Sequence, residues 1–306
     1  MPSDVALHHG RQLALVSVLV SAALAAMSVA VGLAAGSVSV VAIGVEFAGD
    51  VLTSTVVFVG LLVASRPPDD NHPYGHGRIE TVAGLFVGFV LIAGGAGIVW
   101  RSITDVGLQT RAPEWPALIV LIVAIVVRSV MAAQKLRVAR QIGSLALRSD
   151  AWNDAVDILS AGVALVAVVL ARAFPERLLA ADHYGAVVVG LIVVGTGVRV
   201  VRSATLDLAD TMPDPGMIEA VRRIALSVPG VDAVEKQYAR KTGLQYHIDL
   251  HVEVAPDMTV RESHRIAHEV QASVLRQLGW VAGVLVHVEP AGGVSADGGL
   301  APGSST

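Results

Sequence analysis

Residues 38–64 read VSVVAIGVEFAGDVLTSTVVFVGLLVA, an apolar run that contains two carboxylates, Glu46 and Asp50. Crossing a bilayer takes about 20 apolar residues for a hydrocarbon core of roughly 30 Å, so this run is long enough. The two acids are four residues apart, and on a helix both would point from one face. A charged residue at mid-membrane costs about 2.5–3.5 kcal/mol on insertion scales. The stretch therefore predicts a membrane helix whose carboxylates need a cation or protons.

The rest of the chain supports a membrane protein. Only 16% of its 306 residues are charged and 54% are hydrophobic, whereas soluble globular chains carry about 25% charged residues. The net charge of −4 argues against a nucleic-acid partner, and zero cysteines exclude disulfide scaffolds and thiol-based metal sites. Six apolar runs are long enough to span a bilayer, at 13–33, 38–64, 79–100, 115–133, 144–171 and 184–201.

Basic residues flanking these runs predict the orientation. Most lie on one side: Arg11, Arg66, Arg78, Lys135, Arg137, Arg140, Arg148, Arg199 and Arg202. The other side carries Arg101, Arg111, Arg172 and Arg177. The positive-inside rule therefore places both termini in the cytoplasm. We expect a multi-pass protein of the inner (plasma) membrane, in contact with lipid, although organelle membranes also fit.

The composition changes after Asp207. Residues 213–228 and 259–278 have helical patterns, and 231–241, 244–254 and 283–289 read as strands. The α-β-β-α-β order predicts a small α+β sandwich with its helices on one face of the sheet. We expect a six-helix membrane domain at 1–208, a metal-binding and dimerisation domain at 209–290, and a disordered tail at 291–306.

The fifth apolar run repeats the acidic anomaly, with Asp150, Asn153, Asp154 and Asp157 at helical spacing. Asp50 lies about 21 Å from Ala64 at 1.5 Å per residue, and Asp157 lies about 20 Å from Ser144. The depths match, so Glu46, Asp50, Asn153 and Asp157 could surround one ion. In the alternative interpretation the buried carboxylates are protonated, or hydrogen-bonded to neighbours such as Ser39 and Thr53.

Histidines supply two further candidate metal sites. In the loop RPPDDNHPYGHGR at 66–78, Asp69, His72 and His76 could converge on a divalent cation. In the soluble domain, side chains on alternate strand positions share a face, and histidines one turn apart share a helix face. These are His247, Asp249, His251, Glu253, His264, His268, His287 and Glu289. Exposed loop histidines and a solvated polar sheet face are the alternatives.

Together, these features resemble the cation diffusion facilitator family of divalent-metal/proton antiporters. The resemblance covers residues 10–290 and rests on E-x-x-x-D at 46–50, DDNHPYGHGRIE, SLALRSDAWNDAVD and the histidine-bearing C-terminal domain. It implies six membrane helices, a metallochaperone-like cytosolic domain and a homodimer.

The resemblance also implies ligand sets. It assigns Glu46, Asp50, Asn153 and Asp157 to the membrane site, preferring Asn153 to Asp154, and Asp69, His72 and His76 to the loop. In the cytosolic domain it assigns His251, His264, His287, Glu289 and Glu235, the last where relatives often carry histidine. It further implies a charged pair of Arg78 with Asp207.

Relatives that handle zinc typically carry histidine at the position of Asn153. Three carboxylates and one amide form a hard oxygen site that favours Mn²⁺ by ligand type, although the Irving–Williams order favours Zn²⁺. We therefore expect a secondary transporter that exports divalent cations in exchange for protons. The expected ranking is Mn²⁺, then Fe²⁺, then Zn²⁺ or Cd²⁺, and the same ions are expected to bind the cytosolic domain as regulatory ligands. A membrane-anchored metal sensor and a membrane metallohydrolase are the alternatives; the chain has no H-E-x-x-H motif.

Overall fold

The computed structural model describes residues 4–64, 69–107, 111–142, 145–243 and 245–292. Six of its long helices are apolar enough to cross a membrane. Their bounds are α1 (Asp4–Ala34), α2 (Val38–Ala64), α3 (Arg78–Thr104), α4 (Trp115–Ile142), α5 (Leu145–Ala173) and α7 (Ala181–Leu208). A single short turn of helix, α6 (Pro175–Leu178), follows α5. The predicted six spans are confirmed. Ser144, from which the depth of Asp157 was counted, lies outside the described residues.

Small residues let these helices pack closely. A Cβ atom added at Gly197 of α7 would lie 2.8 Å from the backbone oxygen of Gly88 on α3. Large apolar side chains such as Phe86, Phe89 and Leu191 project outward and are more than half exposed. Close contacts through glycine inside, with apolar side chains outside, are the pattern expected of helices packed in lipid.

A buried carboxylate ties the start of α7 to the turn between α1 and α2. Asp182 Oδ1 accepts a hydrogen bond from Ser37 Oγ at 2.7 Å and another from Ser39 Oγ, and Oδ2 accepts one from the Val38 N–H at 2.7 Å. Val38 is the first residue of α2, and a negative charge is stabilised at a helix N-terminus. Ser39, which the sequence offered as one example of a donor to the acids of α2, therefore donates to Asp182 instead.

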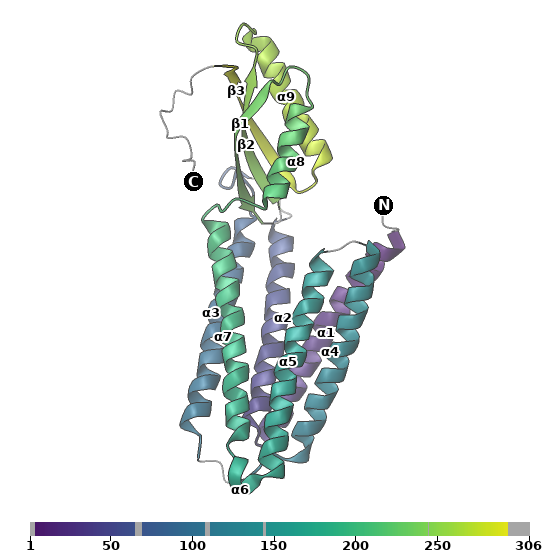
Figure 1. Cartoon of the computed structure of the whole chain (residues 1–306), viewed down its shortest axis with the longest axis vertical. Helices are drawn as coiled ribbons and strands as arrows, with labels where there is room; N and C mark the ends of the chain where they lie inside the picture. Colours follow the sequence, from purple (N-terminus) through teal and green to yellow (C-terminus); the bar gives the residue numbers. More distant parts are fainter. Residues whose placement is uncertain (1–3, 65–68, 108–110, 143–144, 244, 293–306) are drawn as a thin grey trace, which may run out of the picture. The chain divides into compact units, whose positions relative to one another are not determined.

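The C-terminal part contains α8 (Pro215–Leu226), β1 (Ala233–Thr242), β2 (Gln245–Val254), α9 (Val260–Gln277) and β3 (Val281–Pro290). β1 pairs antiparallel with β2, and β2 pairs parallel with β3. The predicted α-β-β-α-β fold is confirmed (Figure 1). Thr259 and Glu262 form a capping box that begins α9, because each satisfies a backbone N–H that the first turn leaves unpaired.

The two faces of the sheet differ in chemistry. Alternate residues of β2, including Ile248, Leu250 and Val252, are buried against apolar side chains of α8 and α9. The intervening residues face the opposite side, among them His251. The β1–β2 register shifts between Val234 and Lys236, so Glu235 sits in a β-bulge.

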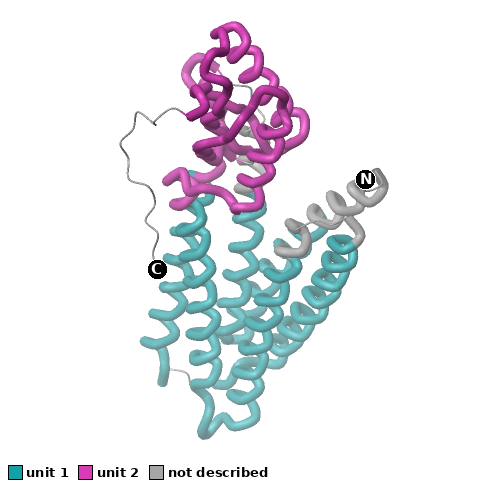
Figure 2. Tube along the Cα trace, turned by 45° about the horizontal axis from the view of Figure 1, so that its top comes forward, with its two compact units in different colours: residues 1–59, 82–204 teal, residues 60–81, 205–306 magenta. Residues whose placement is uncertain are grey.

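The chain forms two compact units, 1–59 with 82–204, and 60–81 with 205–306 (Figure 2). Residues 60–81, which include the histidine loop, therefore group with the C-terminal domain. The expected boundary near residue 208 stays a prediction, and the tail expected at 291–306 lies mostly outside the described residues.

Candidate metal centre

The acids of α2 and α5 meet in a small pocket inside the helix bundle. Glu46, Asp50, Asn153 and Asp157 line a cavity of about 20 Å³, which we call the bundle pocket. A water-sized particle needs roughly 10–15 Å³ by this measure, so the pocket has room for a single ion or water. The structure thus brings together the four side chains that the sequence proposed as one ligand set.

Their hydrogen bonds leave acceptor capacity free. Asn153 Nδ2 donates to Asp50 Oδ1 at 3.2 Å, and Ser160 Oγ donates to Glu46 Oε1 at 2.8 Å. The other Glu46 oxygen, Oε2, is buried and accepts no hydrogen bond from any residue that the structure describes. Thr53 donates to the Gly49 carbonyl instead of to an acid. A buried oxygen without a donor costs free energy, so this carboxylate needs a cation or a proton.

Arg128 of α4 is a component of the site that sequence reasoning missed. Its guanidinium contacts Asp50 at 2.7 Å, Asp154 at 2.8 Å and Asp157 at 3.2 Å, and its side chain is only 4% exposed. The sequence does contain a sign of this residue's role, because Arg128 is a single arginine inside the fourth apolar run, where a charge is costly.

Asp154, which the sequence places in the acidic stripe of the fifth run, has a different role from its neighbours. It does not line the bundle pocket, and its carboxylate lies between Arg128 and the Nζ of Lys135, which is 2.7 Å from Oδ2. The preference for Asn153 over Asp154 as a pocket residue agrees with this geometry. Asp154 is a counter-ion for Arg128 and Lys135 of α4.

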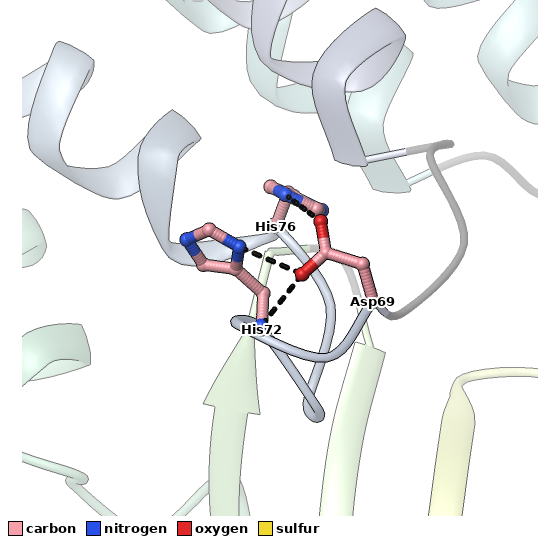
Figure 3. A group of neighbouring side chains, drawn as sticks. All are labelled: Asp69, His72 and His76. Carbon is pink, nitrogen blue, oxygen red and sulfur yellow. Dashed lines mark hydrogen bonds and ion pairs between the residues drawn. The ribbon is translucent and has the colours of Figure 1, made fainter.

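The loop at 69–76 forms a second candidate site (Figure 3). Asp69, His72 and His76 each offer a ligand atom, and these three atoms lie within 4.8 Å of one another. His72 Nδ1 lies 3.0 Å from Asp69 Oδ1, and His76 Nε2 lies 3.4 Å from Oδ2. Slight desolvation raises the pKa of Asp69, but hydrogen bonds from His72 outweigh it and lower that pKa overall. The carboxylate is thus kept ionised, as a metal ligand must be.

The same loop packs on the hairpin between β1 and β2. The Tyr74 ring lies 5.4 Å from the His247 ring, and the Arg240 guanidinium lies 4.6 Å from the centre of the Tyr74 ring. Partial burial, followed by the nearby charge of Arg240, lowers the pKa of His247. His247 is therefore a contact residue of the loop rather than part of the sheet-face cluster.

The open face of the sheet carries a third cluster. Ligand atoms of His251, His287 and Glu289 all lie within 4.8 Å of one another. His251 Nδ1 is 2.5 Å from Glu289 Oε1, and His287 Nε2 is 3.6 Å from the same oxygen. Two imidazoles and a carboxylate suit Zn²⁺ and other transition metals, so the donor set fits a metal ion.

Glu235 joins this cluster through the bulge of β1. It shares a hydrogen bond with Glu289, which raises the pKa of Glu235 and is the main cause of the lowered pKa of Glu289. His251 also hydrogen-bonds Glu289 and lowers that pKa further. Glu235 therefore adds a second carboxylate beside the two imidazoles of this cluster.

His264 lies elsewhere. It is exposed on α9, and its Nε2 is 3.1 Å from that of His268. The structure therefore does not bring it to the cluster of His251, His287 and Glu289 within one chain.

The pair of Arg78 with Asp207 that the family resemblance implied does not form in this structure. Arg78 pairs with Asp210, and Asp207 pairs with Lys241.

Comparisons with known proteins cover nearly the whole chain. Residues 14–209 match the family model for the cation efflux transmembrane domain, and residues 213–291 match that for the cation efflux protein cytoplasmic domain. The manganese efflux system protein MneP of Bacillus subtilis is 26% identical over 284 residues, covering 92% of this chain and 96% of that protein. The manganese efflux system protein MneS of the same organism is 27% identical over 266 residues, covering 87% and 90%.

Among solved structures, the fragment MamM-CTD 215-293 is 29% identical and covers 24% of this chain and 95% of that chain, with a TM-score of 0.24.

The fold and the site together define a membrane transporter of metal cations. The chain has six apolar helices, an acidic pocket within them and a soluble domain that can bind metal. The chain belongs to the cation efflux family, the cation diffusion facilitators. It is a multi-pass metal efflux transporter with a cytoplasmic C-terminal domain of a type associated with dimerisation, and it is not an enzyme.

Proposed function

We propose that the chain exports divalent transition-metal cations from the cytoplasm in exchange for protons, with Glu46, Asp50, Asn153 and Asp157 as the ligands of the exported ion. The observation that carries this proposal is the bundle pocket itself, where three carboxylates and an amide from α2 and α5 line a cavity sized for one ion. Polar groups at this depth in apolar helices are costly and therefore mark an ion pathway.

The ligand types support Mn²⁺ as the preferred cargo. The bundle pocket offers carboxylate and amide oxygens, and none of the described residues lining it is a histidine. Oxygen ligands suit Mn²⁺, whereas imidazole would favour Zn²⁺. Two relatives of the chain are named as manganese efflux proteins, and that agrees with the chemistry. Fe²⁺ comes next in the ranking, then Zn²⁺ and Cd²⁺.

Protons are the natural counter-substrate for a site built of carboxylates. When the metal leaves, the acids of the pocket lose the charge that balanced them, and proton binding restores the balance. Entry of protons down their gradient would then drive metal export.

The working unit is proposed to be a homodimer in the inner membrane, in contact with lipid and with both termini in the cytoplasm. The distribution of Arg and Lys between the loops supports this orientation. The cytoplasmic-domain match supports association of the two C-terminal domains. Metal bound at the loop and at the sheet face would regulate transport by favouring one arrangement of those domains.

Proteoliposomes that contain a pH-sensitive dye test the proposed exchange. Purified full-length protein is supplied in turn with Mn²⁺, Fe²⁺, Zn²⁺ and Cd²⁺, and proton movement is recorded for each metal. We expect the largest signal with Mn²⁺. Strong exchange with Zn²⁺ but none with Mn²⁺ would keep the exchange and overturn the ranking. No signal with any metal would overturn proton exchange and revive the metal-sensor alternative.

Replacing His251 with alanine should weaken cytosolic metal binding by about tenfold or more, about 1.4 kcal/mol, because the cluster loses one of two imidazole ligands. His268→Ala, which removes an imidazole from α9, is the matched control. The chain has no native cysteine, so one engineered cysteine on the C-terminal domain can report the distance between protomers by fluorescence.

We expect metal-dependent closure of the domains to weaken in His251→Ala, and further when His264→Ala is added, while the ranking of transported metals stays the same. A variant that closes normally but changes its metal ranking would contradict the regulatory role.

A further inference from the structure

Arg128 is a permanent cation placed among the proposed ligands of the exported ion. Arginine keeps its proton in proteins, so its charge is present in every state of the site. Its guanidinium contacts Asp50 and Asp157, and its face lies 4.5 Å from the centre of the Phe47 ring. Both of these carboxylates line the bundle pocket. A divalent cation and the guanidinium therefore compete for the same oxygens.

The charges around Arg128 come from three helices. Glu46 and Asp50 lie on α2, Asp154 and Asp157 on α5, and Lys135 on α4 itself. Lys135 and Asp154 form a buried ion pair whose net charge is zero whichever partner holds the proton. The three carboxylates of the pocket carry three negative charges when ionised, and the single positive charge of Arg128 reduces the net charge to minus two. That total equals the charge of one divalent cation, which makes the loaded site neutral.

Asp154 is an ion-pair partner that the guanidinium can keep when a metal ion occupies the pocket. It contacts Arg128 Nη1 at 2.8 Å, its side chain is 1% exposed, and it lies outside the lining of the pocket. If Arg128 released Asp50 and Asp157, it would keep Asp154 as a partner. A buried charge that retained no partner would be strongly unfavourable.

We propose, on the basis of the export function above, that Arg128 acts as a tethered competitor that determines how tightly the pocket holds its divalent cation. With the site empty, the guanidinium binds Asp50 and Asp157. When the metal arrives, the guanidinium withdraws to Asp154, and when the metal leaves, it returns. The pocket thus binds its cargo loosely enough to release it, and Arg128 sets the affinity of the pocket without being a metal ligand.

The test compares two substitutions with opposite expected effects. In Arg128→Met the competitor is gone, so we expect purified full-length protein to bind Mn²⁺ about tenfold more tightly and to turn over more slowly, because release becomes limiting. In Asp154→Asn the retreat is lost and Arg128 is held in the pocket, so we expect Mn²⁺ to bind about tenfold more weakly. Arg128→Lys, which restores a cation, should lie near the wild type.

Equilibrium binding of Mn²⁺ at one fixed pH gives the affinity of the bundle pocket when it is measured in a background of His72→Ala with His251→Ala, which weakens the two cytosolic sites. Proteoliposome uptake gives KM and the maximal rate. A purely structural ion pair would weaken binding in both Arg128→Met and Asp154→Asn, and that result would overturn the proposal, as would unchanged affinity in both. If Arg128→Met does not fold by size-exclusion chromatography, Arg128→Gln, which removes the charge but keeps a hydrogen-bond donor, takes its place with the same expectation of tighter binding. Failure of the wild type to transport would refute the proposed function instead, since these affinities are measured separately.

Discussion

We expect Asp157→Ala to lose at least about a hundredfold of metal transport, about 2.7 kcal/mol, while membrane insertion is retained. The substitution removes one of three carboxylates from the bundle pocket. It also leaves Arg128, which contacts Asp157 at 3.2 Å, to compete for the acids that remain. Both effects weaken the binding of a divalent cation. Metal-dependent proton movement in proteoliposomes measures the loss.

The matched control is Asp105→Ala, which removes the same carboxylate from a half-buried position after the end of α3, outside the bundle pocket. That variant should transport like the wild type. Asp50→Ala should behave like Asp157→Ala, because Asp50 lines the same pocket. Metal-driven proton movement that survived in Asp157→Ala would refute the assignment of this pocket.

Asn153→His should raise the ratio of Zn²⁺ to Mn²⁺ transport by about tenfold or more, about 1.4 kcal/mol. Asn153 offers an amide beside Asp50, to which its Nδ2 donates at 3.2 Å. An imidazole in its place is a softer nitrogen ligand that suits Zn²⁺, whereas oxygen ligands suit Mn²⁺. Competition between the two metals in the same liposomes measures the ratio directly.

Asn153→Asp is the control for this change, because it keeps an oxygen ligand at the position and should preserve the preference for Mn²⁺. A Zn²⁺ to Mn²⁺ ratio that stayed constant in Asn153→His would show that residue 153 does not contact the exported ion. Loss of all transport in both variants would instead indicate that the amide is needed to hold Asp50 in place.

Much of this architecture follows from hydrophobic periodicity. The apolar runs predicted the six long helices because bilayer thickness sets a minimum length, although the helices extend beyond the runs at many ends. Helical spacing also placed Glu46 with Asp50, and Asn153 with Asp157, on single faces. Their meeting across two helices was inferred from matched depth, and the structure shows these four side chains around one cavity.

The features that were missed depend on contacts that a linear pattern does not contain. Arg128 reads as one unfavourable residue in an apolar run, and only packing of α4 against α2 and α5 shows its three carboxylate partners. Glu235 was assigned to the cytosolic site by the family resemblance alone. The bulge of β1 at this position, next to which Glu235 hydrogen-bonds Glu289, has no reliable sequence signature. Arg78 could pair with either Asp207 or Asp210, which are three residues apart, and only the structure shows that its partner is Asp210.

The hydrogen bonds of Asp182 bear on how the bundle can move. They fasten the start of α7 to the start of α2. Since α7 leads into the cytoplasmic domain, this fastening lies at the opposite end of the membrane. We expect these hydrogen bonds to hold the two helices together at that end during transport, so that any separation of α2 from α7 is largest at their cytoplasmic ends.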